Sequence, residues 1–324
     1  MIRYVIRRLI YLVPLFFGIL IIVFVASRIA GDPVQLMTTQ NPRITAEAKD
    51  NLREYYGLDK PLYYQFFIFL GQLFQGNLGN SYAIRGGIAV TSLLGDYAWL
   101  TFQLQLAALV LSLLIAIPVG IISAKKQYSK LDVTVTTTSL VGTCIPVFYM
   151  GIIAIIIFSY FLGWFPPGGA YSILIERYPF GSAILDNLWH MVLPTAVLTF
   201  AIIAPVVLLV RSSMLEVLRQ DYILAARASG LSERSVIYKH ALRNALIPVV
   251  TYVGLYFGAM LAGAPITEKV FNWPGVGRLF VEATTKLDFP VIMGITVFIT
   301  IMTLIANLVT DLTYGYIDPR IRLE

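Results

Sequence analysis

The sequence is poor in the residues that most enzymes use for chemistry. One cysteine and two histidines occur among 324 residues. The lone cysteine, Cys144, excludes an intrachain disulfide and a cysteine-based metal cluster, and it is expected to be a small apolar residue in a helix. We therefore expect no metal site and no cofactor in this chain.

Sequence patterns for nucleotide hydrolysis and covalent catalysis are also missing. The patterns G-x-x-x-x-G-K-[ST], G-x-S-x-G, H-E-x-x-H and C-x-x-C are all absent. Because the glycine-rich loop that cradles phosphates is missing, the chain is not expected to hydrolyse ATP by that route. We predict that the protein is not an enzyme.

Charged residues are scarce as well. They make up 13% of the chain, against about 25% in soluble globular proteins. Hydrophobic residues make up 58%, and the mean hydropathy is +0.77. A chain this apolar cannot cover its surface with polar groups, so a lipid bilayer is its expected solvent. The net charge of +6 is attributed to membrane orientation, and no nucleic-acid partner is expected.

Long uncharged runs are what the sequence has in abundance. A helix that spans a membrane needs about 20 predominantly apolar residues. Runs of that size are Leu9–Ser27, Tyr97–Ala124, Val133–Ile175, Asn187–Val210, Asn244–Thr267 and Phe289–Thr310. The third could hold two helices, but GWFPPGG at 163–169 should end it in a loop after one span. We predict an all-α membrane protein with six transmembrane helices.

The first run is predicted to be a retained transmembrane helix. Arg3, Arg7 and Arg8 resemble the charged start of a signal peptide. However, the apolar run that follows is longer than a signal core of about 7–15 residues, and no A-x-A cleavage site precedes Gly31.

Basic residues gather in segments 3–8, 125–130, 211–243 and 320–322. Loops rich in Lys and Arg stay in the cytoplasm, so both termini are predicted to be cytoplasmic. Three parts are expected. Residues 1–30 hold the N-terminal tip and the first helix, and residues 31–97 form an external region with amphipathic helices. Residues 98–324 form a core of five helices that includes the cytoplasmic loop 211–247.

No predicted span carries an ionisable group near its centre. Asn307 and Asp311 share a helix face at the cytoplasmic end of the last span. This pair could line a pathway, or it could form a helix–helix hydrogen bond or an interfacial carboxylate. His190 opens the fourth span, where an interfacial or packing role is expected. The membrane part is therefore predicted to be a conduit without its own energy source.

The cytoplasmic segment DYILAARASGLSERSVIYKHALRNALIPVV (221–250) separates two apolar runs. Apolar and small residues recur at a spacing of three to four from Met214 to Ser229, which predicts one helix face. Gly230 should then end the helix in a left-handed conformation, and Ser232 should cap the next helix. Pro248 should bend the junction with the fifth span.

The role of this segment stays open from its residues alone. The small residues of AARASG would let a partner protein approach the backbone closely, with Arg227 paired to acidic groups at the rim of that interface. Alternatively, the segment is an amphipathic linker lying on anionic lipid.

Two motifs in this segment resemble a known family. D-Y-I-x-x-A-R-A-x-G-L at 221–231 and H-A-L-R-N-A-L-I-P at 240–248 resemble the EAA-type cytoplasmic loop of permease subunits in ATP-binding-cassette importers for peptides and nickel. Leu224 stands where the general motif has an acidic residue, and Pro248 falls later than in the general motif. Both departures are similar to the peptide branch.

The resemblance extends along nearly the whole chain. Its further segments are YVIRRLIYLVP (4–14) with GDP (31–33), YGLDKPLYYQF (56–66), GNLGNS (76–81), FNWPGVGRLF (271–280), LDFP (287–290) and NLVTDLTYGYIDPRI (307–321). LDFP departs from the Arg-Asp pair more usual in the family at that place.

The resemblance implies the B-type permease subunit of such an importer, with the type I importer fold, in the cell membrane. It implies a second, homologous permease subunit, two cytoplasmic ATP-binding subunits and an extracytoplasmic substrate-binding protein as partners. The residues it implies for coupling to the ATPase are Asp221, Ala225, Ala226, Arg227, Ala228, Ser229, Gly230 and Leu231. Di- or oligopeptides are the expected cargo, with oligosaccharide, nickel or glutathione as alternatives. A secondary transporter or a membrane scaffold is the alternative from another class.

Overall fold

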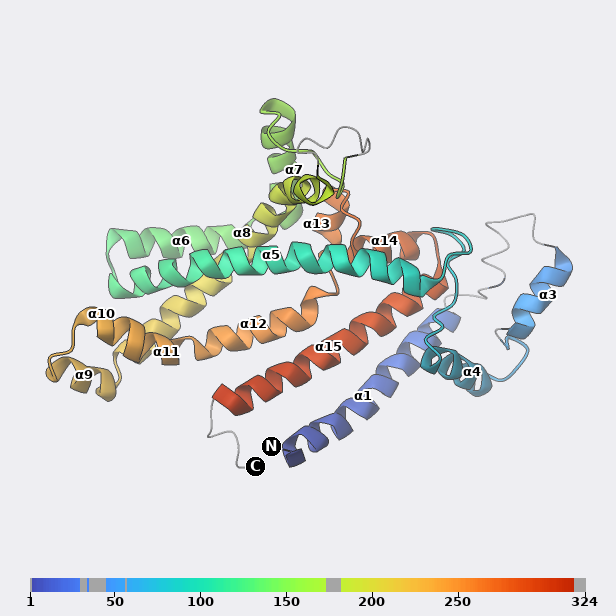
Figure 1. The fold of residues 1–324 in the computed structure, drawn as a ribbon, viewed down its shortest axis with the longest axis horizontal. Helices are drawn as coiled ribbons and strands as arrows, with labels where there is room; N and C mark the ends of the chain where they lie inside the picture. The colour runs from blue at the N-terminus through green and yellow to red at the C-terminus, as the bar shows by residue number, and fades with distance from the viewer. Residues whose placement is uncertain (1, 30–33, 35–44, 56, 173–181, 318–324) are drawn as a thin grey trace. The chain divides into compact units, whose positions relative to one another are not determined.

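A computed structural model describes residues 2–29, 34, 45–55, 57–172 and 182–317 (Figure 1). Within these ranges the structure is helical, and an isolated bridge between Asn80 and Ala89 is the only β-type pairing. The helices are α1 (Ile2–Ile29), α3 (Ala46–Tyr55), α4 (Leu62–Phe74), α5 (Val90–Lys125), α6 (Lys130–Cys144), α7 (Val147–Ala154), α8 (Ala183–Leu218), α9 (Asp221–Ala228), α10 (Glu233–Ser235), α11 (Leu242–Ala245), α12 (Ile247–Met260), α13 (Pro265–Val270), α14 (Val276–Thr285) and α15 (Phe289–Ile317). Two π-helical segments, η1 (Ile155–Phe161) and η3 (Val236–Ala241), continue α7 and α10. The predicted all-α architecture is confirmed.

Four helical stretches in the described residues are long and apolar enough to cross a membrane. They are Ile10–Ile29, Val90–Lys125, Ala183–Leu218 and Phe289–Thr310. Counting α6 and α7–η1 together as one bent span makes five. The predicted span 244–267 contains α12, whose 14 residues fall short of the length of about 20 that a span needs. The count of six therefore stays a prediction.

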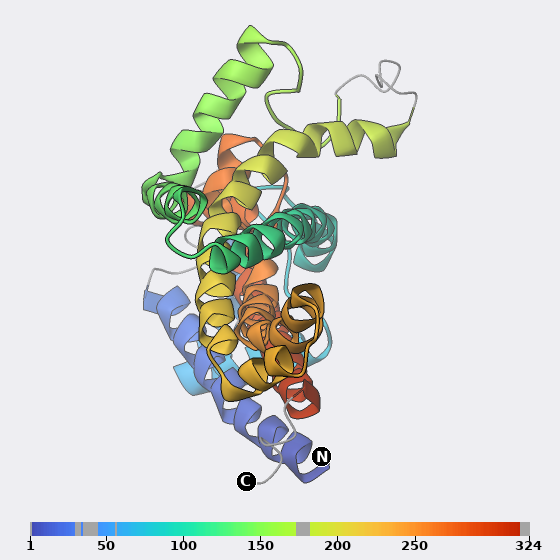
Figure 2. The same ribbon diagram turned by 90° about the vertical axis from the view of Figure 1, so that its left-hand side faces the viewer.

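The third apolar run breaks earlier than predicted. The expected break was the loop at 163–169, but α6 already ends at Cys144 and α7 begins at Val147, with a bend of 95° between the two helices. Pro146 causes this bend, because proline has no N–H and pushes the preceding residue into an extended conformation. Ile145 has that conformation, with ψ of 123°. In Figure 2 the segment α7–η1 rises away from α6. The predicted exit loop does follow, after Phe161.

The chain divides into two compact units. The first holds residues 1–101, 261–265 and 275–324, and the second holds residues 102–260 and 266–274. In the first unit, α1 and α15 contact each other along their lengths (Figure 1). A buried cluster also joins the start of α5 to α14 and α15, and includes Leu93, Leu279 and Ile295.

Two segments of the first unit that are far apart in the sequence, GNLGNS and LDFP, meet in space. Asp288 is fully buried, and its Oδ2 accepts hydrogen bonds from Ser81 Oγ at 2.7 Å and from the Ala83 backbone N–H at 2.9 Å. The N–H groups of Tyr82 and Ile84 also donate to this oxygen, both at 3.2 Å. The carboxylate thus holds the turn at 81–84 against the start of α15.

In the second unit, the aromatic loop at 271–273 packs against the glycine-rich loop at 163–169. Phe271 and Trp273 are buried, and Gly169 N–H donates to Phe271 O at 2.8 Å. A Cβ added at Gly168 would lie 2.3 Å from the same oxygen, so only glycine fits there. The pairing covers the irregular backbone of the aromatic loop with protein, which is the condition under which such backbone is tolerated among membrane helices.

Candidate functional site

The cytoplasmic segment lies in the second unit and begins where α8 ends. Apolar spacing predicted one continuous helix face from 214 to 229, but the structure breaks it: α8 ends at Leu218, and α9 starts at Asp221. Gln220, with ψ of 147°, is extended and turns the chain at this break. Asp221 then sits in the first turn of α9, where a carboxylate suits the positive end of the helix dipole.

The predicted helix–glycine–helix corner is confirmed. Gly230 has φ of +78°, and its N–H donates to Arg227 O at 3.0 Å. Nothing lies within 4 Å of a Cβ added at Gly230, so the backbone conformation, not internal crowding, favours glycine there. Ser232 caps the next helix, since its side chain accepts from the Ser235 N–H at 3.4 Å.

Buried apolar side chains hold the corner in place. Ile223 of α9, Val236 and Ala241 of η3, and Met214 of α8 are each fully buried. Helix α9 contacts η3, and η3 contacts α8. The buried residue of α9 is therefore Ile223, which the predicted apolar face did not include.

A hydrogen bond and a helix break complete the segment. Asn244 Nδ2 donates to the hydroxyl of Tyr222 at 2.7 Å, which links α11 to α9. The helix then breaks at Leu246, and Pro248 lies in the first turn of α12. First-turn proline is tolerated because its missing N–H would be unpaired there. The predicted break near Pro248 is confirmed.

The residues predicted to couple to the ATPase lie mostly on the outside of this corner. Ala225, Arg227, Ala228, Ser229 and Gly230 are exposed, as are Asp221 and Leu231, and Ala226 is half-buried. In Figure 1, α9 and α10 lie beyond the end of α8. A surface of small side chains is thus accessible to a partner without any rearrangement of this segment.

Arg227 has a partner within the chain. Its Nε lies 2.9 Å from Glu233 Oε1, so the ion pair closes over the Gly230 corner. Both side chains are well exposed, and a pair of this kind contributes about 0.2–1 kcal/mol to stability. Arg227 is predicted to pair with acidic groups of another protein. Glu233 competes with those groups for the Arg227 side chain.

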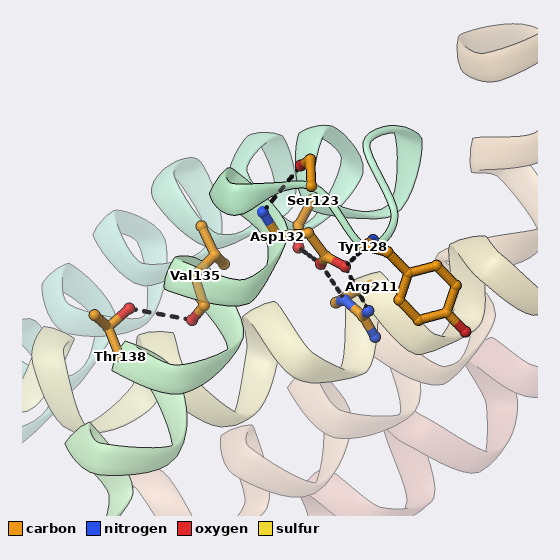
Figure 3. A network of polar contacts seen from close by, with 7 residues as sticks. Ser123, Tyr128, Asp132, Val135, Thr138 and Arg211 are labelled. Carbon is orange, nitrogen blue, oxygen red and sulfur yellow. Dashed lines mark hydrogen bonds and ion pairs between the residues drawn. The ribbon is translucent and has the colours of Figure 1, made fainter.

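A buried ion pair fixes α8 to the preceding helical hairpin (Figure 3). Asp132, at the start of α6, is 2% exposed, and Arg211 of α8 donates to both of its oxygens, from Nε at 2.5 Å and from Nη2 at 2.8 Å. Ser123 Oγ of α5 donates to Oδ1 at 2.5 Å, and the Tyr128 N–H donates to Oδ2 at 2.9 Å. The ends of α5, α6 and α8 are therefore tied together two helical turns before α8 ends.

Sequence reasoning missed this ion pair. Asp132 and Arg211 lie 79 residues apart, so no local spacing links them, and both counted only as charges near span ends.

The other polar residues singled out from the sequence are placed as follows. Asn307 is half-buried on α15, whereas the side chain of Asp311 lies outside the described residues. His190 is buried, and its Nδ1 lies 2.8 Å from the carbonyl oxygen of Asp186, as a packing role requires. Among the described side chains, no cluster of three or more His, Cys, Asp and Glu could hold a metal ion.

Comparison with known proteins matches both ends of the chain to one family. Residues 116–323 match the family described as "Binding-protein-dependent transport system inner membrane component", and residues 1–86 match the N-terminal part of such membrane components. The chain is 41% identical over 322 residues to the oligopeptide transport system permease protein AppB of Bacillus subtilis, with 99% of each chain covered.

Two further relatives cover the same length. The di/tripeptide transport system permease protein DppB of Pseudomonas aeruginosa is 40% identical over 339 residues, and the dipeptide transport system permease protein DppB of Escherichia coli K12 is 37% identical over 339 residues. Both alignments cover 99% of this chain and 99% of the relative. Together with the apolar helices and the helix–glycine–helix corner, these matches show that the chain belongs to the inner-membrane permease subunits of binding-protein-dependent ATP-binding-cassette importers, a family of transport proteins and not of enzymes.

Proposed function

We propose that this chain forms half of the pathway by which an ATP-driven importer carries di- or oligopeptides across the cell membrane. The observation that carries the proposal is similarity of about 40% identity over essentially the full length to permeases named for peptide transport. Because the similarity includes both ends of the chain, it applies to the whole subunit and not to one shared loop.

The proposed assembly contains a second, homologous permease subunit, two cytoplasmic ATP-binding subunits and an extracytoplasmic binding protein that delivers the cargo. The corner formed by Ala225–Gly230 is proposed to dock into a cleft of one ATP-binding subunit. Its exposed small side chains support this assignment, because they allow close approach of another protein's backbone. Docking also implies that this corner lies in the cytoplasm.

The proposed coupling step is mechanical. When the ATP-binding subunits close, they would displace α9, and the buried contacts of Ile223 would pass that displacement to η3 and α8. The ion pair between Asp132 and Arg211 would extend it to the ends of α5 and α6. The chain itself makes and breaks no covalent bond in this cycle.

Uptake measurements test the cargo assignment. In a strain lacking only this subunit, we expect labelled di-, tri- and pentapeptide uptake to fall and to return with the wild-type gene but not with Gly230→Val. Excess unlabelled peptide should compete, whereas oligosaccharide, nickel and glutathione should not. If loss of the subunit leaves peptide uptake unchanged but abolishes uptake of labelled oligosaccharide, nickel or glutathione, the importer type is the same and its cargo is another. Co-purification of ATP-binding subunits separates an importer of any cargo from a secondary transporter or a scaffold.

A further inference from the structure

The second unit contains a groove that the proposed transport cycle does not use. It has a volume of about 870 Å³ and lies between the end of α5 and the α10–η3 segment. Its apolar lining comes from Ile121 and Ile122 of α5 and from Ile237 and Tyr238 of η3. Ile121 and Ile237 are buried, whereas Ile122 and Tyr238 remain 43% and 56% exposed. The groove is large enough for part of an amphiphilic molecule, since ligand sites typically measure about 300–1,000 Å³.

Three cations line the same groove. Lys125 ends α5, Lys126 follows it, and Arg234 belongs to α10. All three side chains are exposed, and within the described parts of the chain none of them forms an ion pair. Arg211 and Arg227 of the same unit, in contrast, are paired with carboxylates. The groove therefore offers unneutralised positive charge beside an apolar surface.

We propose that this groove binds the head group of an anionic phospholipid, with the phosphate among Lys125, Lys126 and Arg234 and an acyl chain against Ile122 and Tyr238. A basic pocket at the cytoplasmic end of membrane helices is a known form of lipid recognition. Because segments 125–130 and 211–243 are predicted to be cytoplasmic, the lipid would belong to the cytoplasmic leaflet. The binding chemistry does not depend on this orientation.

The apolar lining favours a lipid over an acidic protein surface. Ile122 lies near the end of a membrane-spanning helix and is exposed, so its side chain can contact the hydrocarbon of the bilayer. Lysines that follow such a turn extend toward lipid phosphates, and tyrosine is enriched at the same depth. A carboxylate of a partner protein would use the cations but would leave Ile122 and Tyr238 without an apolar contact.

A bound lipid would also brace the corner. Arg234, Ile237 and Tyr238 lie on the α10–η3 segment that follows the Gly230 corner, and η3 packs against α9. A phosphate bridging this segment to the end of α5 would restrict the movement of the corner relative to that helix. We therefore expect anionic lipid to change the coupling of ATP hydrolysis to transport, in addition to binding.

A binding measurement tests the assignment. The purified transporter complex, stripped of lipid in detergent, is titrated with phosphatidylglycerol and, in parallel, with phosphatidylcholine of the same chains, and bound lipid is counted by native mass spectrometry. The triple variant Lys125→Gln/Lys126→Gln/Arg234→Gln removes the groove's charge. The control Arg219→Gln/Lys239→Gln/Arg243→Gln removes the same charge from exposed bases of the same loop that do not line the groove.

We expect the groove variant to lose at least about tenfold in affinity for phosphatidylglycerol, since each base near a lipid phosphate contributes appreciably to binding. The control variant should lose less than about twofold. Equal losses in both variants would overturn the site, because the binding would then reflect net charge alone. Equal affinity for phosphatidylcholine in the wild type would overturn it as well.

Two further arms separate the lipid from other anions. Inorganic phosphate at millimolar concentration should not displace phosphatidylglycerol, because phosphate has no acyl chain. Ile122→Ser should weaken the binding of long-chain phosphatidylglycerol more than the binding of its dihexanoyl form. Complete displacement by phosphate would show a simple anion site. If the groove variant releases the ATP-binding subunits but still binds phosphatidylglycerol, the cations contact a protein and the lipid assignment is wrong.

Discussion

At the scale of single residues, Gly230 is the position where backbone geometry constrains the proposed docking most. Its φ of +78° costs a residue with a Cβ about 1–2 kcal/mol, and more if the residue is β-branched. No neighbouring atom lies within 4 Å of the added Cβ, so an internal clash does not contribute. Substitutions at Gly230 therefore probe the backbone conformation and the surface presented to a partner.

We expect Gly230→Val to abolish uptake and to reduce co-purification of the ATP-binding subunits while the chain still inserts into the membrane. Gly230→Asn is the matched variant, because asparagine adopts the left-handed conformation at low cost. If Asn preserves association, backbone strain is the cause of the Val defect. If Asn also abolishes association, added volume in the interface is the cause. Undiminished association and uptake in Gly230→Val would remove the docking assignment.

The ion pair of Asp132 and Arg211 is a second constraint at this scale. Asp132→Ala leaves Arg211 without its counter-ion and removes the acceptor of Ser123 Oγ and the Tyr128 N–H. Breaking a buried pair on one side costs about 3–5 kcal/mol, whereas replacing both partners by apolar residues is often neutral. We therefore expect Asp132→Ala to lower the unfolding temperature in detergent, and Asp132→Leu/Arg211→Met to recover most of the loss. An equal loss in the single and double variants would contradict a role specific to the pair.

At the scale of elements, α9 is the helix whose surface should determine association with the ATP-binding subunits. Ala228 is exposed, so Ala228→Trp should leave the fold of this chain intact. In a close interface the added volume costs about 1–3 kcal/mol or more, which corresponds to a loss of association of about 5- to 150-fold. Ala228→Ser, which stays small, should associate normally. Normal association of Ala228→Trp would show that this face of α9 is free in the complex.

Charge reversal at Arg227 distinguishes docking from the lipid-surface alternative for the same helix. Arg227→Glu replaces the exposed ion pair with Glu233 by repulsion, and screening makes that effect small. We expect a weaker defect in ATPase association than in Ala228→Trp, and a larger one at low salt than at high salt. The lipid-surface alternative predicts the reverse ranking, with the charge reversal most harmful.

At the scale of the whole molecule, the distribution of basic residues predicts how the chain lies in the membrane. Asn51 of α3 is predicted to be external, and Gln127, between α5 and α6, is predicted to be cytoplasmic. Cys144 is exposed on α6, so both test variants need Cys144→Ala as background. In intact cells, a membrane-impermeant maleimide should label Asn51→Cys but not Gln127→Cys. Labelling of Gln127→Cys after permeabilisation is the control, and its labelling in intact cells would reverse the orientation.

Composition and local spacing were sufficient for the architecture and for the corner. Scarce charge and long apolar runs demand helices in lipid, because only paired backbone is tolerated there. The left-handed residue at Gly230 and the cap at Ser232 depend on neighbours a few positions away, so both could be predicted from the sequence. Helix length was less predictable: uncharged sequence extends through 244–267, whereas α12 has 14 residues.

Contacts over long sequence separations were decided by the tertiary structure. Arg211 lies 79 residues from Asp132, and Ser81 lies 207 residues from Asp288, and no periodicity encodes such a distance. The apolar run 133–175 breaks twice, at Pro146 and again in the glycine-rich loop at 163–169. Both break helices locally, but Gly168 is bound against Phe271 from a distant segment, which local reasoning could not include. Local backbone preferences depend on neighbouring residues, so the sequence alone determines them. The partner of a buried charge depends on which distant residue the tertiary packing places beside it.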